Sequence, residues 1–120
     1  MAKVVRFTDL IAWQEGHKLV LRVYDLTKRF PSEEKFSLTS QIRRAGVSVT
    51  SNIAEGFGRR SNKDKLHFYT MSRGSLLELQ NQCIIARDIG LTDVASFETL
   101  EEQIIIVHKL LNGLMRSIEG

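Results

Sequence analysis

The segment from Ser40 to Gly58, SQIRRAGVSVTSNIAEGFG, places the strongest constraint on how this chain folds. Apolar residues recur every three or four positions along it and just before it, which predicts one face of an α-helix. These residues are Leu38, Ile42, Ala45, Val49, Ile53 and Phe57. The same stretch also carries polar side chains, namely Gln41, Arg43, Arg44, Asn52 and Glu55. We therefore expect a helix packed on more than one side, whose polar groups bond to neighbouring helices or to a partner.

Three further stretches have helical periodicity, and none alternates in the manner of a strand. We expect helices over residues 9–29, 37–57, 62–89 and 94–117, within a single domain spanning residues 1–120. Pro31 ends the first helix, because the residue before a proline avoids the α region. Since the connections are short, neighbouring helices should be antiparallel. The predicted fold is all-α, an up-down-up-down four-helix bundle.

The last predicted helix is apolar on two sides. One stripe consists of Leu100, Ile104, Val107, Leu111, Leu114 and Ile118. A second stripe consists of Phe97, Ile105, Ile106 and Leu110. A small bundle leaves the outer side of such a helix uncovered, so we expect several copies of the chain to associate.

The second predicted hairpin allows a check on register. Counting from Arg60 in its loop places Gly46 and Gly74 at matching heights on the two helices. Close backbone approach would offset the cost of each glycine, up to ~1 kcal/mol relative to Ala. The same count brings Arg44 near Glu78, which predicts an Arg44–Glu78 or Arg43–Glu78 ion pair. The alternative is that both charges are solvated and contribute almost nothing to stability.

Several segments together carry a family resemblance. They are Leu38–Ala45, Ser51–Arg59, Arg73–Gly74–Ser75–Leu76 with Glu78–Leu79, and Val23–Tyr24–Asp25–Leu26–Thr27 leading to Phe30–Pro31. In this order and over nearly the whole chain, they resemble the 23S rRNA intervening-sequence protein family, the small bacterial four helix bundle proteins.

The resemblance implies a four-helix bundle commonly assembled as a ring-like homopentamer, whose biochemical role is largely unestablished. A related group, the accessory variability determinants of diversity-generating retroelements, forms basic pentamers that bind nucleic acid and a reverse transcriptase. RNA, DNA or a reverse-transcriptase-like protein are therefore the partners that the resemblance suggests.

Enzyme chemistry finds little support in the residues. A di-metal carboxylate bundle needs two inward Glu-x-x-His motifs, and the chain has none. His17, His67 and His108 fall at similar heights on three predicted helices, which leaves a zinc site as a distant alternative. The single cysteine, Cys83, lies in an apolar run and is expected to be a buried, inert thiol in a reducing cytoplasm. We expect no cofactor, no catalytic residue, no small-molecule substrate and no membrane association.

Clustered cations are the best candidates for function. The formal net charge is only +3, but oligomerisation would multiply it. Arg59, Arg60, Lys63 and Lys65 at the second hairpin loop are predicted to contact phosphates, and Arg43 and Arg44 form a second candidate pair. Lys28, Arg29 and Lys35 are expected at the opposite end of the bundle, and we interpret them as a solvated surface without a binding role. The favoured function is a non-enzymatic oligomer that binds nucleic acid electrostatically, and the alternative is a structural scaffold.

Overall fold

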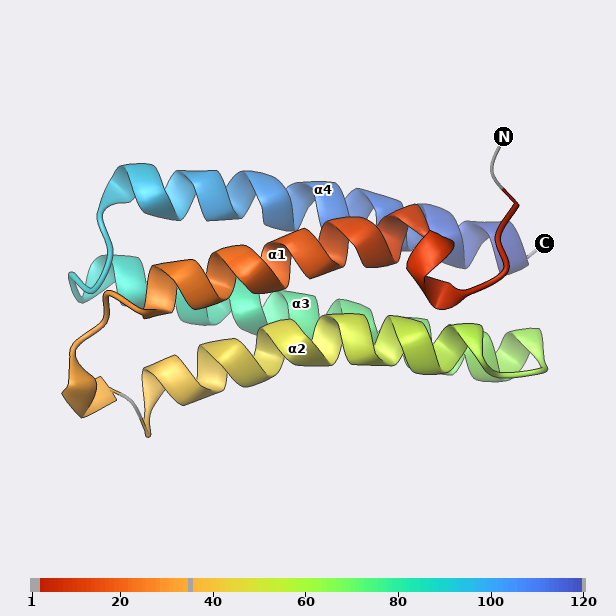
Figure 1. The fold of residues 1–120 in the computed structure, drawn as a ribbon, viewed down its shortest axis with the longest axis horizontal. Coiled ribbons are helices and arrows are strands. Elements are labelled where there is room, and N and C mark those ends of the chain that lie inside the picture. The colour runs from red at the N-terminus through yellow and green to blue at the C-terminus, as the bar shows by residue number, and fades with distance from the viewer. Residues whose placement is uncertain (1–2, 35, 120) are drawn as a thin grey trace.

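The structure, a computed structural model, describes residues 3–34 and 36–119. The elements in these ranges are the short 3-10 helices η1 (Phe7–Asp9) and η2 (Ser32–Glu34) and the helices α1 (Ile11–Thr27), α2 (Leu38–Phe57), α3 (Asn62–Asp88) and α4 (Val94–Glu119). The four α-helices lie side by side in an elongated bundle, in which α1 and α3 each pack on α2 and α4 (Figure 1). No strand occurs among the described residues, so the predicted all-α class is confirmed.

The helix boundaries follow local capping chemistry. The Asp9 carboxylate accepts the backbone N–H groups of Val5 and Arg6, each at 3.0 Å. These bonds close η1, and α1 consequently begins at Ile11, two residues later than predicted. The Ser61 hydroxyl accepts the Asp64 N–H at 3.1 Å and caps α3.

The start of α4 has a similar explanation. The Asp93 carboxylate accepts the Ser96 N–H at 2.8 Å and so caps this helix. Just before it, Gly90 adopts a left-handed conformation with φ of 84°, which glycine reaches without the steric cost of a side chain. Together these residues turn the chain out of α3 and into α4.

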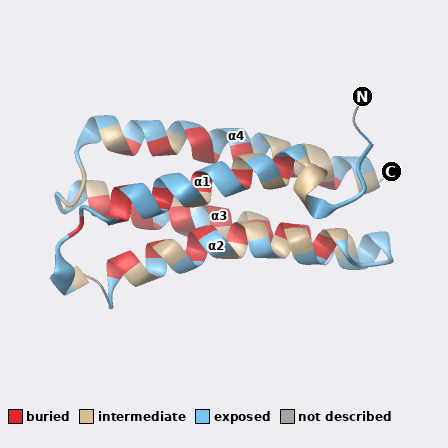
Figure 2. Ribbon diagram, in the orientation of Figure 1, coloured by how far each residue is buried: buried red, intermediate tan, exposed pale blue. Residues whose placement is uncertain are grey.

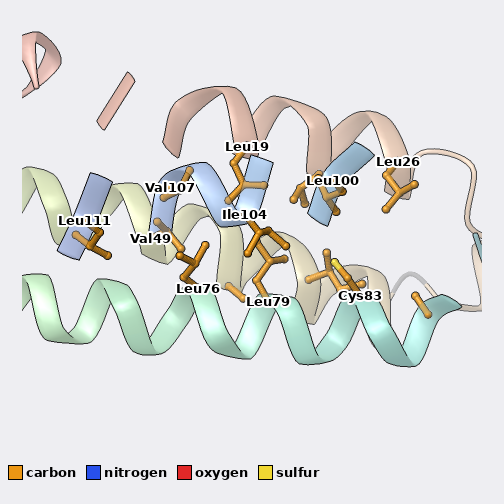
Figure 3. Packing of buried hydrophobic residues seen from close by; sticks show 14 of the residues in the cluster. Leu19, Leu26, Val49, Leu76, Leu79, Cys83, Leu100, Ile104, Val107 and Leu111 are labelled. Carbon is orange, nitrogen blue, oxygen red and sulfur yellow. The ribbon is translucent and has the colours of Figure 1, made fainter. Parts of the chain in front are cut away.

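The predicted apolar faces form the core. Five of the six residues on the α2 stripe are buried, from Leu38 at 8% exposed to Ile53 at 0%, and Phe57 is half-buried. Buried residues of all four helices line the inside of the bundle (Figure 2). Figure 3 shows Leu19, Val49, Leu76 and Ile104 pointing into the space between the helices. No described helix is long and apolar enough to cross a membrane.

Hydroxyl groups join α2 to α3 inside the bundle. Ser72 is fully buried and donates a 2.7 Å hydrogen bond to the Val49 carbonyl. One turn away, the Ser48 and Ser75 hydroxyls lie 2.8 Å apart. Val49 of α2 pairs with Ser72 of α3, and the preceding residue, Ser48, pairs with the later residue Ser75. The two helices therefore run antiparallel.

The predicted contact between Gly46 and Gly74 is wrong. Gly46 is buried, but a Cβ atom placed there would face Val23 of α1, at 3.7 Å. Gly74 is exposed, and a Cβ atom there would meet nothing within 4 Å. Matching heights along two helices did not fix their rotation about their axes, and the serines rather than the glycines occupy the α2–α3 contact.

The second apolar stripe of α4 divides in two. Phe97 is buried and Leu110 is half-buried, whereas Ile105 and Ile106 are exposed at 45% and 42%. Leu77 of α3 is also exposed; it lies between Arg73 and Gln80, as Ile105 lies between Glu101 and Asn112. The hydrogen bonds Arg73–Asn112 and Gln80–Glu101 join the two helices on either side of that pair.

Candidate nucleic-acid interface

The loop between α2 and α3 forms a basic tip, defined here as Arg59, Arg60, Lys63 and Lys65. The tip lies at one end of the bundle, near the beginning of α1 and the end of α4 (Figure 1). Its four cations do not have equal freedom. Arg60 and Lys63 are exposed, and no hydrogen bond or ion pair joins either side chain to another described residue. These two cations are available to an external anion.

Lys65 is used within the fold. It is half-buried, and its Nζ donates to the Phe57 carbonyl at 2.6 Å and lies 3.5 Å from the Gly56 carbonyl. A cation is favourable here because the last carbonyls of a helix have no intrahelical partner and carry partial negative charge. The Lys65 ammonium group therefore stabilises the end of α2, and it is less available to a phosphate than the side chains of Arg60 and Lys63.

Arg59 is partly engaged. Its guanidinium forms a 3.3 Å ion pair with Glu55, one turn earlier on α2, and lies 4.3 Å from the centre of the Phe68 ring. Both side chains of the ion pair remain about half exposed, so the pair is weak and screened by salt. A phosphate can compete with Glu55 for this guanidinium. The contact with Phe68 holds the Arg59 side chain in place, so Arg59 is less free to move toward a phosphate than Arg60 or Lys63.

The predicted ion pair between Glu78 and Arg43 or Arg44 does not form. Arg43 is half-buried; its Nε donates to the Thr27 hydroxyl at 2.8 Å, and its guanidinium carbon lies 4.6 Å from the centre of the Tyr24 ring. Arg44 is exposed, and no hydrogen bond or ion pair to another described residue involves it. Consecutive helical residues point about 100° apart, and this rotation turns Arg43 toward α1.

The three histidines are not brought together. His17 stacks on Trp13 with ring centres 4.9 Å apart, and His67 lies edge-on to Phe68 of its own helix. The described residues contain no group of three or more His, Cys, Asp or Glu side chains able to hold a metal ion. The zinc-site alternative has no geometric basis in this part of the chain.

Cys83 is a buried thiol. Burial first, and the negative charge of Glu101 second, raise its pKa to about 12. A thiol with that pKa is almost wholly protonated at neutral pH, and the thiolate is the reactive form. The predicted buried thiol is confirmed, and its raised pKa gives no support to nucleophilic chemistry. Lys28 and Arg29, at the other end of the bundle, both approach the exposed Asp25, while Lys35 lies outside the described residues.

The fold and these surfaces define a class: an all-α bundle with four long helices and exposed cations at one hairpin. A model of the 23S rRNA-intervening sequence protein family matches residues 8–113. The chain belongs to this family.

A solved structure shares the fold. It is that of a protein of unknown function from the S23 ribosomal protein family, from Bacteroides thetaiotaomicron. It superposes with a TM-score of 0.82 at 20% sequence identity, covering 88% of this chain and 96% of the other. No curated protein shows significant similarity to this chain. Neither the family nor this structural neighbour indicates an enzymatic activity.

Proposed function

We propose that this chain is a non-enzymatic accessory protein that assembles into a ring-like homo-oligomer and binds nucleic acid through its basic tips. Each subunit is an up-down-up-down bundle, and the family resemblance favours five subunits. The observation that carries the binding proposal is the pair of exposed cations without intramolecular partners, Arg60 and Lys63. Repetition around a ring gives such a pair several phosphates to contact at once.

Exposed apolar side chains support self-association. Leu77 on α3 is 49% exposed, and Ile105 and Ile106 on α4 are 45% and 42% exposed. Three neighbouring aliphatic side chains with this much exposed surface favour an interface with another subunit over a surface in contact with water. Light scattering on the purified protein tests the proposal. A mass of one 13.7 kDa chain at micromolar concentration would refute it.

The binding test compares two double variants with the same change in charge. Arg60→Gln with Lys63→Gln removes the free tip cations, whereas Lys28→Gln with Arg29→Gln removes two cations at the opposite end. For duplex DNA, log K should fall linearly with log salt, at about 0.9 for each neutralised phosphate. The tip variant should lower this slope by about 1.8 for each engaged subunit, while the control should leave it unchanged.

Three results would contradict nucleic-acid binding by the tip. They are a flat salt response, no binding of RNA or DNA at low salt, and equal losses in the two double variants. If the protein instead bound only a nucleic-acid-handling protein, such as a reverse-transcriptase-like partner, and the tip variant weakened that binding, the tip would be a protein-binding surface and direct nucleic-acid binding would be refuted.

A structural scaffold is the second candidate, and a specific observation favours it. Two of the four tip cations serve the fold, because Lys65 binds the α2 carbonyls and Arg59 pairs with Glu55. Charge reversal by Arg59→Glu with Arg60→Glu separates the candidates. Partner recovery from cells that survives this reversal favours the scaffold.

A further inference from the structure

A cleft between α1 and α2 lies far from the basic tip. It has a volume of about 440 Å³, and it is formed by the end of α1 and the first half of α2. Its lining residues are Tyr24, Phe36, Thr39, Ser40, Arg43, Arg44 and Val47. Volumes of about 300–1,000 Å³ are typical of small-ligand sites. No carboxylate is present among these residues, whereas two of them carry guanidinium groups.

The two arginines offer unused hydrogen-bond donors. Arg43 is held in place by its Nε bond to Thr27 and by the Tyr24 ring, and its terminal amino groups form no hydrogen bond with a described residue. Arg44 is exposed and unpaired among the described residues. One guanidinium is thus pre-positioned and the second is free to close on a ligand, an arrangement suited to the several oxygens of a phosphate.

Thr39 supplies the independent observation. This residue lines the cleft and is only 6% exposed, yet its hydroxyl has no hydrogen-bond partner. A buried hydroxyl without a partner is unfavourable, by an amount comparable to a lost hydrogen bond. The hydroxyl oxygen itself has almost no accessible surface, so a ligand would reach it only after the Thr39 side chain rotates toward the cleft. An acceptor bound there would then relieve the cost.

The beginning of α2 adds to the attraction for an anion. Ser37, the N-cap residue, makes no side-chain capping bond, so the first N–H groups of α2 have no side-chain cap. Thr39 and Ser40 belong to this first turn. The N-terminus of a 20-residue helix carries partial positive charge and favours phosphate.

We propose that this α1–α2 cleft binds a terminal phosphate monoester. The phosphate would accept from Arg43, Arg44 and the Thr39 hydroxyl, and the attached nucleoside would lie against Tyr24 and Val47. A monoester fits better than a carboxylate, because its charge of about −1.5 to −2 matches two guanidinium groups. Its source is either a free nucleoside monophosphate or the 5′-phosphorylated end of a strand. This site extends the nucleic-acid proposal but does not require the basic tip.

Calorimetry on the full-length protein tests the cleft. The probes are adenosine 5′-monophosphate, adenosine, inorganic phosphate, and a short RNA carrying either a 5′-phosphate or a 5′-hydroxyl. We expect a phosphate-bearing probe to bind at least tenfold more tightly than its phosphate-free counterpart, and inorganic phosphate to compete with it. Binding of the mononucleotide indicates a free nucleotide, whereas binding of the phosphorylated RNA alone indicates a strand end.

Two variants locate the binding. Thr39→Val removes only the unpartnered hydroxyl, so it should keep the fold intact while weakening affinity about fivefold. Arg44→Gln should weaken affinity about tenfold or more, because it removes a charged donor. Arg60→Gln, at the tip, is the matched control and should change affinity less than twofold.

The outcomes separate this site from the basic tip. Loss in the two cleft variants, with no loss in Arg60→Gln, supports the cleft even if the tip proves inert toward RNA. The cleft proposal is overturned if no phosphate-bearing probe binds at low salt, if phosphorylated and unphosphorylated probes bind equally, or if both cleft variants keep the affinity of the original protein.

Discussion

Gly56 and Gly74 provide a matched pair of identical substitutions for which we predict opposite effects on stability. Both glycines lie inside helices, so replacement by alanine should gain up to ~1 kcal/mol of helix propensity at either position. At Gly74 this gain should appear in full, because the site is exposed and an added Cβ would meet nothing within 4 Å. We expect Gly74→Ala to raise the free energy of unfolding by about 0.5–1 kcal/mol.

At Gly56 the same methyl group meets a filled core. The Cβ would lie 2.6 Å and 2.9 Å from two ring carbons of Tyr69, and 3.1 Å from the Phe68 Cβ. Tyr69 is 2% exposed, so its ring cannot swing into solvent without opening the core. Overpacking of this kind costs about 1–3 kcal/mol, or occasionally more. After the gain in propensity, we expect Gly56→Ala to lower stability by about 1–2 kcal/mol.

Urea denaturation followed by circular dichroism measures both changes. The chains should be compared at one fixed protein concentration, because self-association makes apparent stability depend on concentration. Gly46→Ala is a useful third variant: its Cβ would be in ordinary contact with Val23, at 3.7 Å, and should cost little. If Gly56→Ala proves as stable as Gly74→Ala, the assigned packing of α2 on Tyr69 is wrong.

Three further predictions concern single side chains. Lys65→Met should lower the free energy of unfolding by about 1 kcal/mol, because the α2 carbonyls lose their cation, whereas Lys63→Met should leave denaturation unchanged. Cys83 should resist a thiol reagent at pH 8 in the native protein and react only in denaturant, since its pKa is raised to about 12; rapid native labelling would contradict this. The backbone N–H of Ser96, followed by its hydroxyl, lowers the pKa of Asp93, so the stabilisation from this cap should be present above about pH 4 and be lost as the pH falls through the folded-state pKa. An acid titration of stability in Asp93→Asn against the original chain checks the sign.

Much of the fold could be predicted because the helical period and the capping residues are local signals. The buried stripe of α2 was predicted from the spacing of its apolar residues, and Ser61, which caps α3, is of a residue type that caps prefer. The rotation of each helix about its own axis could not be predicted from such local signals. The count from the hairpin loop gave Gly46 and Gly74 equal heights, but only the packed bundle sets the direction in which each points.

The candidate site was partly predictable for the same reason. Clustered cations at the hairpin identified the tip, but the sequence gave no indication that Lys65 would turn onto the α2 carbonyls. Arg43 and Arg44 of the α1–α2 cleft were identified as a second candidate pair, but the cleft that they line was not predicted. Its one local signal was Thr39 four residues before Arg43, a spacing that places both on one side of a helix. The contribution of Tyr24 comes from another helix and depends on tertiary packing.

The serine pairs between α2 and α3 have a mechanical consequence for the hairpin. Sliding one helix along the other by a turn would detach the buried Ser72 hydroxyl from the Val49 carbonyl and leave both groups unsatisfied. The two helices are therefore locked against shear and should move as one rigid rod. A rod of this kind holds the charges at its end in a fixed pattern before any partner arrives, so docking there would require little loss of conformational freedom.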